Sequence, residues 1–183
     1  MISQKLKNTL KTIFDKENVV IINKELKKRY YELTGMEISE IYQYILEHYS
    51  NIVLNENYGY NAIEKSPFAG DGLDTFSDFI GLVGDSTVFT EYKVYKEQLP
   101  IGYYPIAHID GGNLICINSN TGSIYTWLHD ENEDNCLFLA QKNLEDFIKN
   151  IVKEDSNNIK KDLGINNFHF SDELWNAIKN FKG

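Results

Sequence analysis

Residues 99–130 have the sequence LPIGYYPIAHIDGGNLICINSNTGSIYTWLHD, and this stretch decides the fold. It contains three runs rich in β-branched and aromatic residues, which cover residues 103–109, 113–118 and 123–128. Gly111 and Gly112 separate the first two runs, and an Asn-Thr-Gly turn at 120–122 separates the last two. Because glycine adopts positive φ at little cost, both connections suit tight reversals, and the pattern predicts a meander of three antiparallel strands.

Helical periodicity surrounds this meander, and a favourable N-cap precedes each helical segment. The expected helices are 4–14 after Ser3, 24–34 after Asn23, 40–49 after Ser39, about 86–98 after Asp85 or Ser86, and 144–151 after Asn143. In the third helix we expect four side chains to face inward: Ile41, Tyr44, Ile45 and Tyr49. The β-branched run at 19–22 is typical of a buried strand or an extended entry segment. Together these elements predict an α+β fold with a mainly antiparallel sheet flanked by helices.

The length of 183 residues suits one domain, and the hydrophobic content of 42% argues against disorder over most of the chain. We therefore expect a single domain over residues 1–183. A stripe of Leu174, Ile178 and Phe181 predicts an additional C-terminal helix over about 171–181, after a polar connector over about 153–169. The N-terminal residues lack the apolar stretch of a signal peptide or membrane span, so we expect a cytoplasmic protein without a membrane partner.

The net charge of −9 is concentrated in the middle of the chain, where residues 66–146 carry thirteen acidic side chains and three lysines. This excess repels phosphate backbones and attracts cationic surfaces, so it favours a basic protein partner over nucleic acid. Arg29 is the only arginine in the sequence, which also argues against phosphate recognition. Solubility alone is the competing interpretation of the acidic excess.

No metal or cofactor site follows from the acidic residues or the cysteines. The segment 130–135 begins like a calcium loop, but Asn135 stands where the turn needs glycine and Gln141 where it needs a bidentate glutamate. Asp71, Asp74 and Asp78 are close enough in sequence to converge on a cation, but no further ligand completes that set. Cys116 and Cys136 lack the spacing of a zinc site, and we expect buried thiols rather than a disulfide.

The histidines do not form a recognisable catalytic motif. His108 with Asp110 and His129 with Asp130 resemble the beginning of acid–base pairs, but we expect neighbours on an extended chain to point to opposite faces. We therefore do not predict an enzyme, and a small hydrolase that uses His108 or His129 is the third of three hypotheses.

Residues 99–107, 110–117 and 121–130 together resemble the SUKH superfamily, which contains bacterial immunity proteins and relatives of a fungal cell-wall regulator. The similarity covers about residues 20–152, and a departure lies at Glu37 and Ile38, where family members often carry Leu-Pro. The resemblance implies a helix-flanked, mainly antiparallel sheet that binds a partner protein. Many members neutralise a toxin made by the same cell, and the family supplies no catalytic residues.

The leading hypothesis is an immunity-type protein that acts as a monomer or homodimer, without a cofactor, and blocks a cognate, basic toxin domain such as a nuclease. Its acidic surface would compete for a cationic groove and steer the encounter. The candidate partner-binding residues are Asp71, Asp74, Asp78, Asp130, Glu131, Glu133 and Asp134. The alternative is a non-enzymatic regulatory scaffold that binds an endogenous signalling or cell-wall protein.

Overall fold

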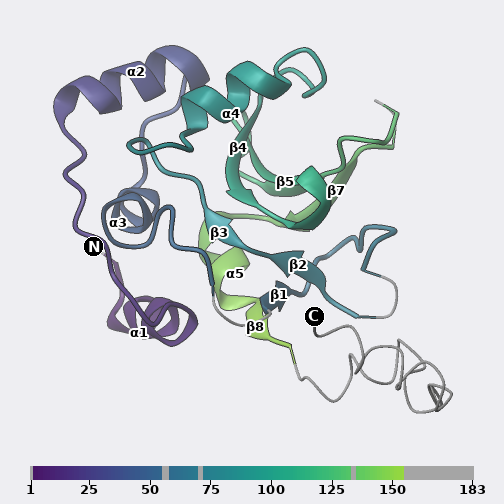
Figure 1. The fold of residues 1–183 in the computed structure, drawn as a ribbon, viewed down its shortest axis with the longest axis horizontal. Helices are drawn as coiled ribbons and strands as arrows, with labels where there is room; N and C mark the ends of the chain where they lie inside the picture. The colour runs from purple at the N-terminus through teal and green to yellow at the C-terminus, as the bar shows by residue number, and fades with distance from the viewer. Residues whose placement is uncertain (1, 55–57, 70–71, 133–134, 155–183) are drawn as a thin grey trace, which may run out of the picture. The chain divides into compact units, whose positions relative to one another are not determined.

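Two antiparallel sheets organise the chain, and the computed structural model describes them over residues 2–54, 58–69, 72–132 and 135–154 (Figure 1). The larger sheet has five strands in the order β3-β4-β5-β6-β7. Their bounds are β3 Asp78–Phe79, β4 Tyr103–His108, β5 Leu114–Asn118, β6 Ile124–Trp127 and β7 Leu137–Gln141. The predicted meander is therefore confirmed as β4, β5 and β6, with the two-residue strand β3 added at one edge and the five-residue strand β7 at the other.

The turns of the meander use glycine where the sequence predicted it. Gly111 and Gly112 have φ values of 75° and 79° within a short 3₁₀ turn, η1 Asp110–Gly112, and Gly122 has a φ of 73° in the next hairpin. Residues with a Cβ atom are strained at such φ values, so glycine at these positions permits the tight turns that set the register of the strands that follow. The register shifts between Pro105 and Ala107, which accommodates a proline inside β4.

A smaller sheet has three strands in the order β2-β1-β8, with bounds β1 Tyr58–Tyr60, β2 Asp74–Phe76 and β8 Ile151–Lys153. Only Ser77 separates β2 from β3, so the chain passes directly from the small sheet to the large one. The two sheets are also joined by side chains, because the Tyr60 hydroxyl lies 2.6 Å from Thr126 Oγ1 and both residues are buried.

Within the described residues, five α-helices accompany the sheets: α1 Gln4–Ile13, α2 Lys24–Thr34, α3 Glu40–His48, α4 Val88–Tyr95 and α5 Leu144–Lys149. Ser3, Asn23 and Ser39 cap the first three helices through their side chains, as predicted. The predicted cap of α4 was wrong. Thr87, rather than Asp85 or Ser86, accepts from the Thr90 amide, and Thr90 in turn accepts from the Thr87 amide. Two reciprocal bonds satisfy more of the free helix amides than one acidic cap does.

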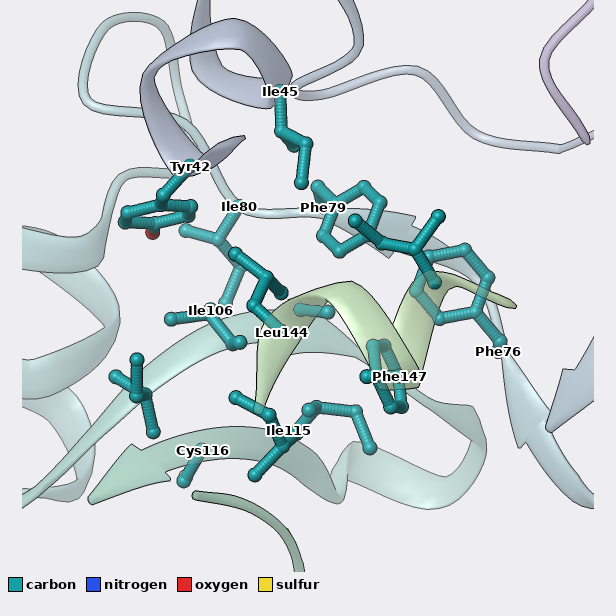
Figure 2. Packing of buried hydrophobic residues seen from close by; sticks show 14 of the residues in the cluster. Tyr42, Ile45, Phe76, Phe79, Ile80, Ile106, Ile115, Cys116, Leu144 and Phe147 are labelled. Atoms are coloured by element: carbon teal, nitrogen blue, oxygen red, sulfur yellow. The ribbon is translucent and has the colours of Figure 1, made fainter. Parts of the chain in front are cut away.

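The core forms where α3 and α5 meet the strands (Figure 2). Phe147 of α5 packs against Tyr60 and Phe76 of the small sheet, with ring centroids 5.0 and 6.1 Å apart respectively. Phe79 of β3 lies 5.0 Å from Phe76 and extends the same aromatic cluster into the large sheet. Around these rings the core continues through Tyr42, Ile45, Ile80, Ile106, Ile115, Cys116 and Leu144.

The predicted inward face of α3 is confirmed in part. Ile45 and Tyr49, the residue that ends the helix, are fully buried as expected, whereas Ile41 and Tyr44 are only partly covered where they pack against the core. Tyr42 and Leu46 are also buried, so the buried face is turned away from Ile41 and Tyr44 and toward these two residues. The register of a short helix with apolar residues on several sides is set by the surface that it packs against, which the helix sequence does not contain.

Of the two interpretations of residues 19–22, the extended entry segment is confirmed and the buried strand is wrong. The segment is extended, but Val19 is 89% exposed and Ile21 is exposed as well, and only Ile22 is buried in the core. Asn18 and Val20 donate backbone hydrogen bonds to His48 and Glu47 at the end of α3, so every second amide is used and the intervening side chains face outward.

The described chain forms one compact unit up to Lys153. The predicted polar connector and C-terminal helix lie outside the described residues and stay predictions. Across the described ranges, no helix combines the length and apolar character that crossing a bilayer requires.

Candidate partner-binding surface

The structure separates the predicted acidic residues into exposed and buried groups. Asp130 and Glu131 are exposed in the turn that follows β6, whereas Asp74 and Asp78 are buried. Asp71, Glu133 and Asp134 lie outside the described residues. The described acidic surface is therefore smaller than the sequence predicted, and it centres on the end of β6.

Asp74 is an internal acceptor at the start of β2. Its carboxylate accepts a short hydrogen bond from the Ser66 hydroxyl and a second, 3.4 Å long, from the Ser66 amide. Ser66 is also buried, so the pair fixes the turn that leads to Phe68. A carboxylate satisfied in this way is not available to a cationic partner.

Asp78 is likewise turned inward, where it pairs with a histidine across two strands. Asp78 of β3 lies opposite His108 of β4, and the Asp78 carboxylate is 3.1 Å from His108 Nδ1. On the other side of the ring, His108 Nε2 lies 3.7 Å from Glu91 Oε1 of α4. The hydrogen bond from Asp78 raises the pKa of His108 above its ordinary value, against the effect of burial, and both carboxylates add to the rise.

The sequence analysis did not expect Asp110 to pair with His108, and in the structure the carboxylates beside His108 are those of Asp78 and Glu91. Ser86 Oγ lies 3.5 Å from His108 Nε2, so a serine, a histidine and an aspartate do come together. The Ser86 hydroxyl, however, donates to Glu91 Oε1 over 3.0 Å. The Ser86 proton is thus directed to the Glu91 carboxylate rather than to the histidine, which is not the arrangement of a serine nucleophile activated by a histidine base.

His129 shows a second departure from the sequence analysis. Its Nε2 lies 3.0 Å from Asp130 Oδ1, although these neighbours were expected to point to opposite faces. The prediction was wrong because β6 ends at Trp127 and residues 129 and 130 form a turn, where the alternation of a strand no longer applies. His129 Nδ1 lies 3.1 Å from the Asn113 side-chain oxygen, so the ring is fixed beside η1.

A hollow of about 350 Å³ lies beside η1 and collects the exposed acids of this region. Asp110 and Asp130 are exposed residues of its lining. The lining also includes Phe68, whose side chain is 70% exposed. The remaining lining residues are Ser66, Asp74, Thr75, Ile109, Gly111, Asn113 and Leu128. None of these ten residues is a lysine or an arginine. With Glu131 beside it, this hollow is the acidic surface of the described chain, defined here by Asp110, Asp130, Glu131 and Phe68.

The predicted buried thiols are confirmed, since Cys116 and Cys136 are both buried and neither forms a disulfide. Burial raises the pKa of the Cys116 thiol well above its ordinary value, which keeps it protonated. In the part of the chain that the structure describes, no group of three or more His, Cys, Asp or Glu side chains is arranged to hold a metal ion.

Three comparisons place the chain among known proteins. A model of the SMI1/KNR4 family (SUKH-1) matches residues 16–150. The SPbeta prophage-derived uncharacterized protein YokK of Bacillus subtilis (strain 168) is 33% identical over 119 residues, which are 63% of this chain and 62% of that protein. The match thus spans less than two thirds of the relative's length. No solved structure gives a significant match. The family match covers most of the chain, including the meander and the helices on both sides of it, and the chain therefore belongs to the SMI1/KNR4 family (SUKH-1).

Proposed function

We propose that this chain is an immunity-type protein that binds a cognate toxin domain in the cytoplasm and neutralises it without catalysis. The observation that carries the proposal is the acidic surface at the end of β6. Two exposed carboxylates, Asp110 and Asp130, line a hollow that also exposes Phe68, and the exposed Glu131 follows Asp130 in the chain. Family membership supports a partner-binding role in general, and the charge of the surface favours a cationic partner.

The geometry resembles a protein-binding site in two respects. An exposed aromatic side chain beside a concave, partly apolar surface is typical of the residues that contribute most to binding energy. Carboxylates around that residue raise the rate of encounter with a cationic surface and discriminate against an anionic one. A toxin that acts on nucleic acid carries a cationic groove, so a nuclease domain is the partner class that this surface fits best.

The site is held in place by the surrounding structure. The Asp110 amide donates to Thr75 Oγ1 over 3.2 Å, which attaches η1 to β2. Asn113 donates from its side chain to the Asp110 carbonyl and accepts from the His129 amide, both over 3.1 Å. The turns that carry Asp110 and Asp130 are thereby fixed to each other, and a pre-organised surface loses little entropy on binding.

The experiment is co-expression of the chain with the product of the neighbouring gene, as the candidate toxin. We expect the wild-type chain to restore growth and to co-purify with the toxin domain. A variant with Asp110→Lys, Asp130→Lys and Glu131→Lys should lose both effects. A matched control with the same change in charge is Glu25→Lys, Glu37→Lys and Glu97→Lys, because these residues are exposed but lie outside the acidic surface.

Full protection by the triple variant at the acidic surface would contradict the proposed binding site. Absence of any binding to the neighbouring gene product by the wild-type chain would contradict the toxin-neutralising function. Capture of an endogenous cell-wall or signalling protein by the same surface would then favour the regulatory scaffold.

A further inference from the structure

A second hollow, of about 620 Å³, opens between the extended segment at residues 18–20 and the loop at residues 83–86, before α4. Three valines in its lining are exposed: Val19 by 89%, Val53 by 71% and Val83 by 46%. Isolated exposed aliphatic residues are common on protein surfaces, but three around one concavity form an apolar patch, and such patches mark interaction sites. We call this feature the valine hollow.

The backbone that presents the valines is held by hydrogen bonds. Asn51 Nδ2 donates to the Val83 carbonyl over 2.9 Å, and Asn51 Oδ1 accepts from the Gly81 amide over 3.1 Å. A Cβ added to Gly81 or to Gly84 would lie 2.7 or 2.9 Å from Asn51 Nδ2, so the loop closes tightly on this side chain. The valines are thus displayed on fixed backbone, and their short β-branched side chains lose little entropy when covered.

The opposite wall of the valine hollow is an open backbone edge. Asn18 and Val20 donate to the end of α3, over 2.7 and 2.9 Å. Among the described residues, the amides of Val19 and Ile21 have no hydrogen-bond partner. An extended segment with every second amide free is the arrangement to which another extended chain adds by β-pairing.

The charge of the lining restricts the occupant. Asp78, Asp85 and His108 belong to the lining, Asp85 is exposed, and none of the twelve lining residues is a lysine or an arginine. A second copy of the chain in a two-fold arrangement would place this patch against itself and bring the two Asp85 side chains together. A partner segment with a basic residue instead gains a favourable ion pair at the rim.

We propose that the valine hollow docks an extended segment of a partner protein that presents aliphatic side chains and a lysine or arginine on one face. The segment pairs with the open edge at residues 18–21, covers Val19, Val53 and Val83 with its aliphatic side chains, and sets its cationic group beside Asp85. This inference goes beyond the proposed function, because the valine hollow shares no residue with the acidic surface.

The test uses the full-length chain labelled with ¹⁵N and three blocked peptides followed by chemical-shift perturbation. The probe is Lys-Thr-Val-Thr-Val-Thr-Lys, whose valines and lysines share one face of an extended chain in either direction. In one control peptide glutamate replaces both lysines, and in the other serine replaces both valines. We expect saturable shifts at residues 18–21, 51–53 and 83–86 with the probe, and at least about fivefold weaker binding of both controls.

Two variants sharpen the result, and their spectra report whether the fold is retained. Asp85→Lys should reverse the preference between the lysine and glutamate peptides, and Val83→Ser should weaken the probe about tenfold. Val94→Ser should leave binding unchanged, because Val94 is an exposed valine of α4 outside the hollow. Equal shifts with all three peptides, or shifts elsewhere, would overturn the proposal. Concentration-dependent shifts at the same amides without peptide would overturn it in favour of a second copy.

Discussion

The cluster at His108 makes a prediction in which pH is the probe. The pKa of His108 is raised by the Asp78 hydrogen bond, so the folded chain binds this proton more tightly than the unfolded chain does. The stabilisation is therefore fully present below the unfolded pKa of about 6.5, and it is lost as the pH rises through the higher folded pKa. The perturbation is His108→Gln, because the glutamine side chain still offers an N–H donor but carries no charge at any pH.

The size of the effect follows from the contacts of His108. A hydrogen bond to a charged group contributes about 1.5–3 kcal/mol, and a neutral one about 0.5–1.5 kcal/mol. The His108 side chain is 28% exposed, and the second carboxylate beside it, that of Glu91, lies 3.7 Å away. Solvent therefore weakens the contribution of these ion pairs to the free energy of unfolding. We expect the variant to be about 1–2 kcal/mol less stable than the wild type at pH 6. The difference should fall within about 0.5 kcal/mol once the imidazole is neutral.

The assay is urea unfolding of both proteins at several pH values between 5.5 and 9, with buried Trp127 as the fluorescent reporter. Subtracting the two curves removes the contribution of every other titrating group that the substitution leaves unchanged. A stability difference that is constant across this range, or one that grows as the pH rises, would refute the charged cluster.

Three further predictions concern the sheets, the acidic surface and the valine hollow. Tyr60→Phe and Thr126→Val should each lower the free energy of unfolding by about 1–3 kcal/mol, because each change leaves one buried hydroxyl without its partner. The double variant should lose clearly less than the sum of the two single losses. Additive losses in urea unfolding would contradict a direct hydrogen bond between the two hydroxyls. Phe68→Ala should weaken toxin binding in calorimetry while changing stability by less than about 0.5 kcal/mol, since the side chain is exposed; equal affinity would remove Phe68 from the site. Gly81→Ala should destabilise the chain by about 1–3 kcal/mol through a clash with the Asn51 side chain. In an Asn51→Ala background, which lacks that side chain, the same change should cost clearly less, and thermal unfolding of the four proteins measures the difference; an equal cost in both backgrounds would place the clash elsewhere.

The sequence predicted the elements whose causes are local. The turns between the strands of the meander contain glycines that adopt positive φ. Ser3, Asn23 and Ser39 cap their helices by accepting a hydrogen bond from the amide three residues further along the chain. Such features depend on neighbouring residues alone, so they appear in a single sequence. The same holds for the end of α2 at Gly35, which has a φ of 71°.

The sequence did not predict features that depend on distant segments. The pairing of Asp78 with His108 arises from a two-residue strand whose pattern is too short to recognise. Asp74 is buried because Ser66 lies across a turn, and formal charge alone gave no indication of that. Residues 19–22 have the composition of a strand, but their neighbours offer an edge rather than a core. The acidic surface is consequently narrower than the charge count indicated.

The binding account is tested with the toxin domain that co-expression with the neighbouring gene product would identify, in a form inactivated at its own catalytic centre. Stopped flow would measure the rate at which the chain associates with this domain over a range of salt concentrations. We predict a wild-type rate that falls steeply with salt. The Asp110→Lys, Asp130→Lys and Glu131→Lys variant should associate at least about tenfold more slowly at low salt, and the two rates should converge at high salt. Equal, salt-insensitive rates for the two proteins would contradict recognition through the acidic surface.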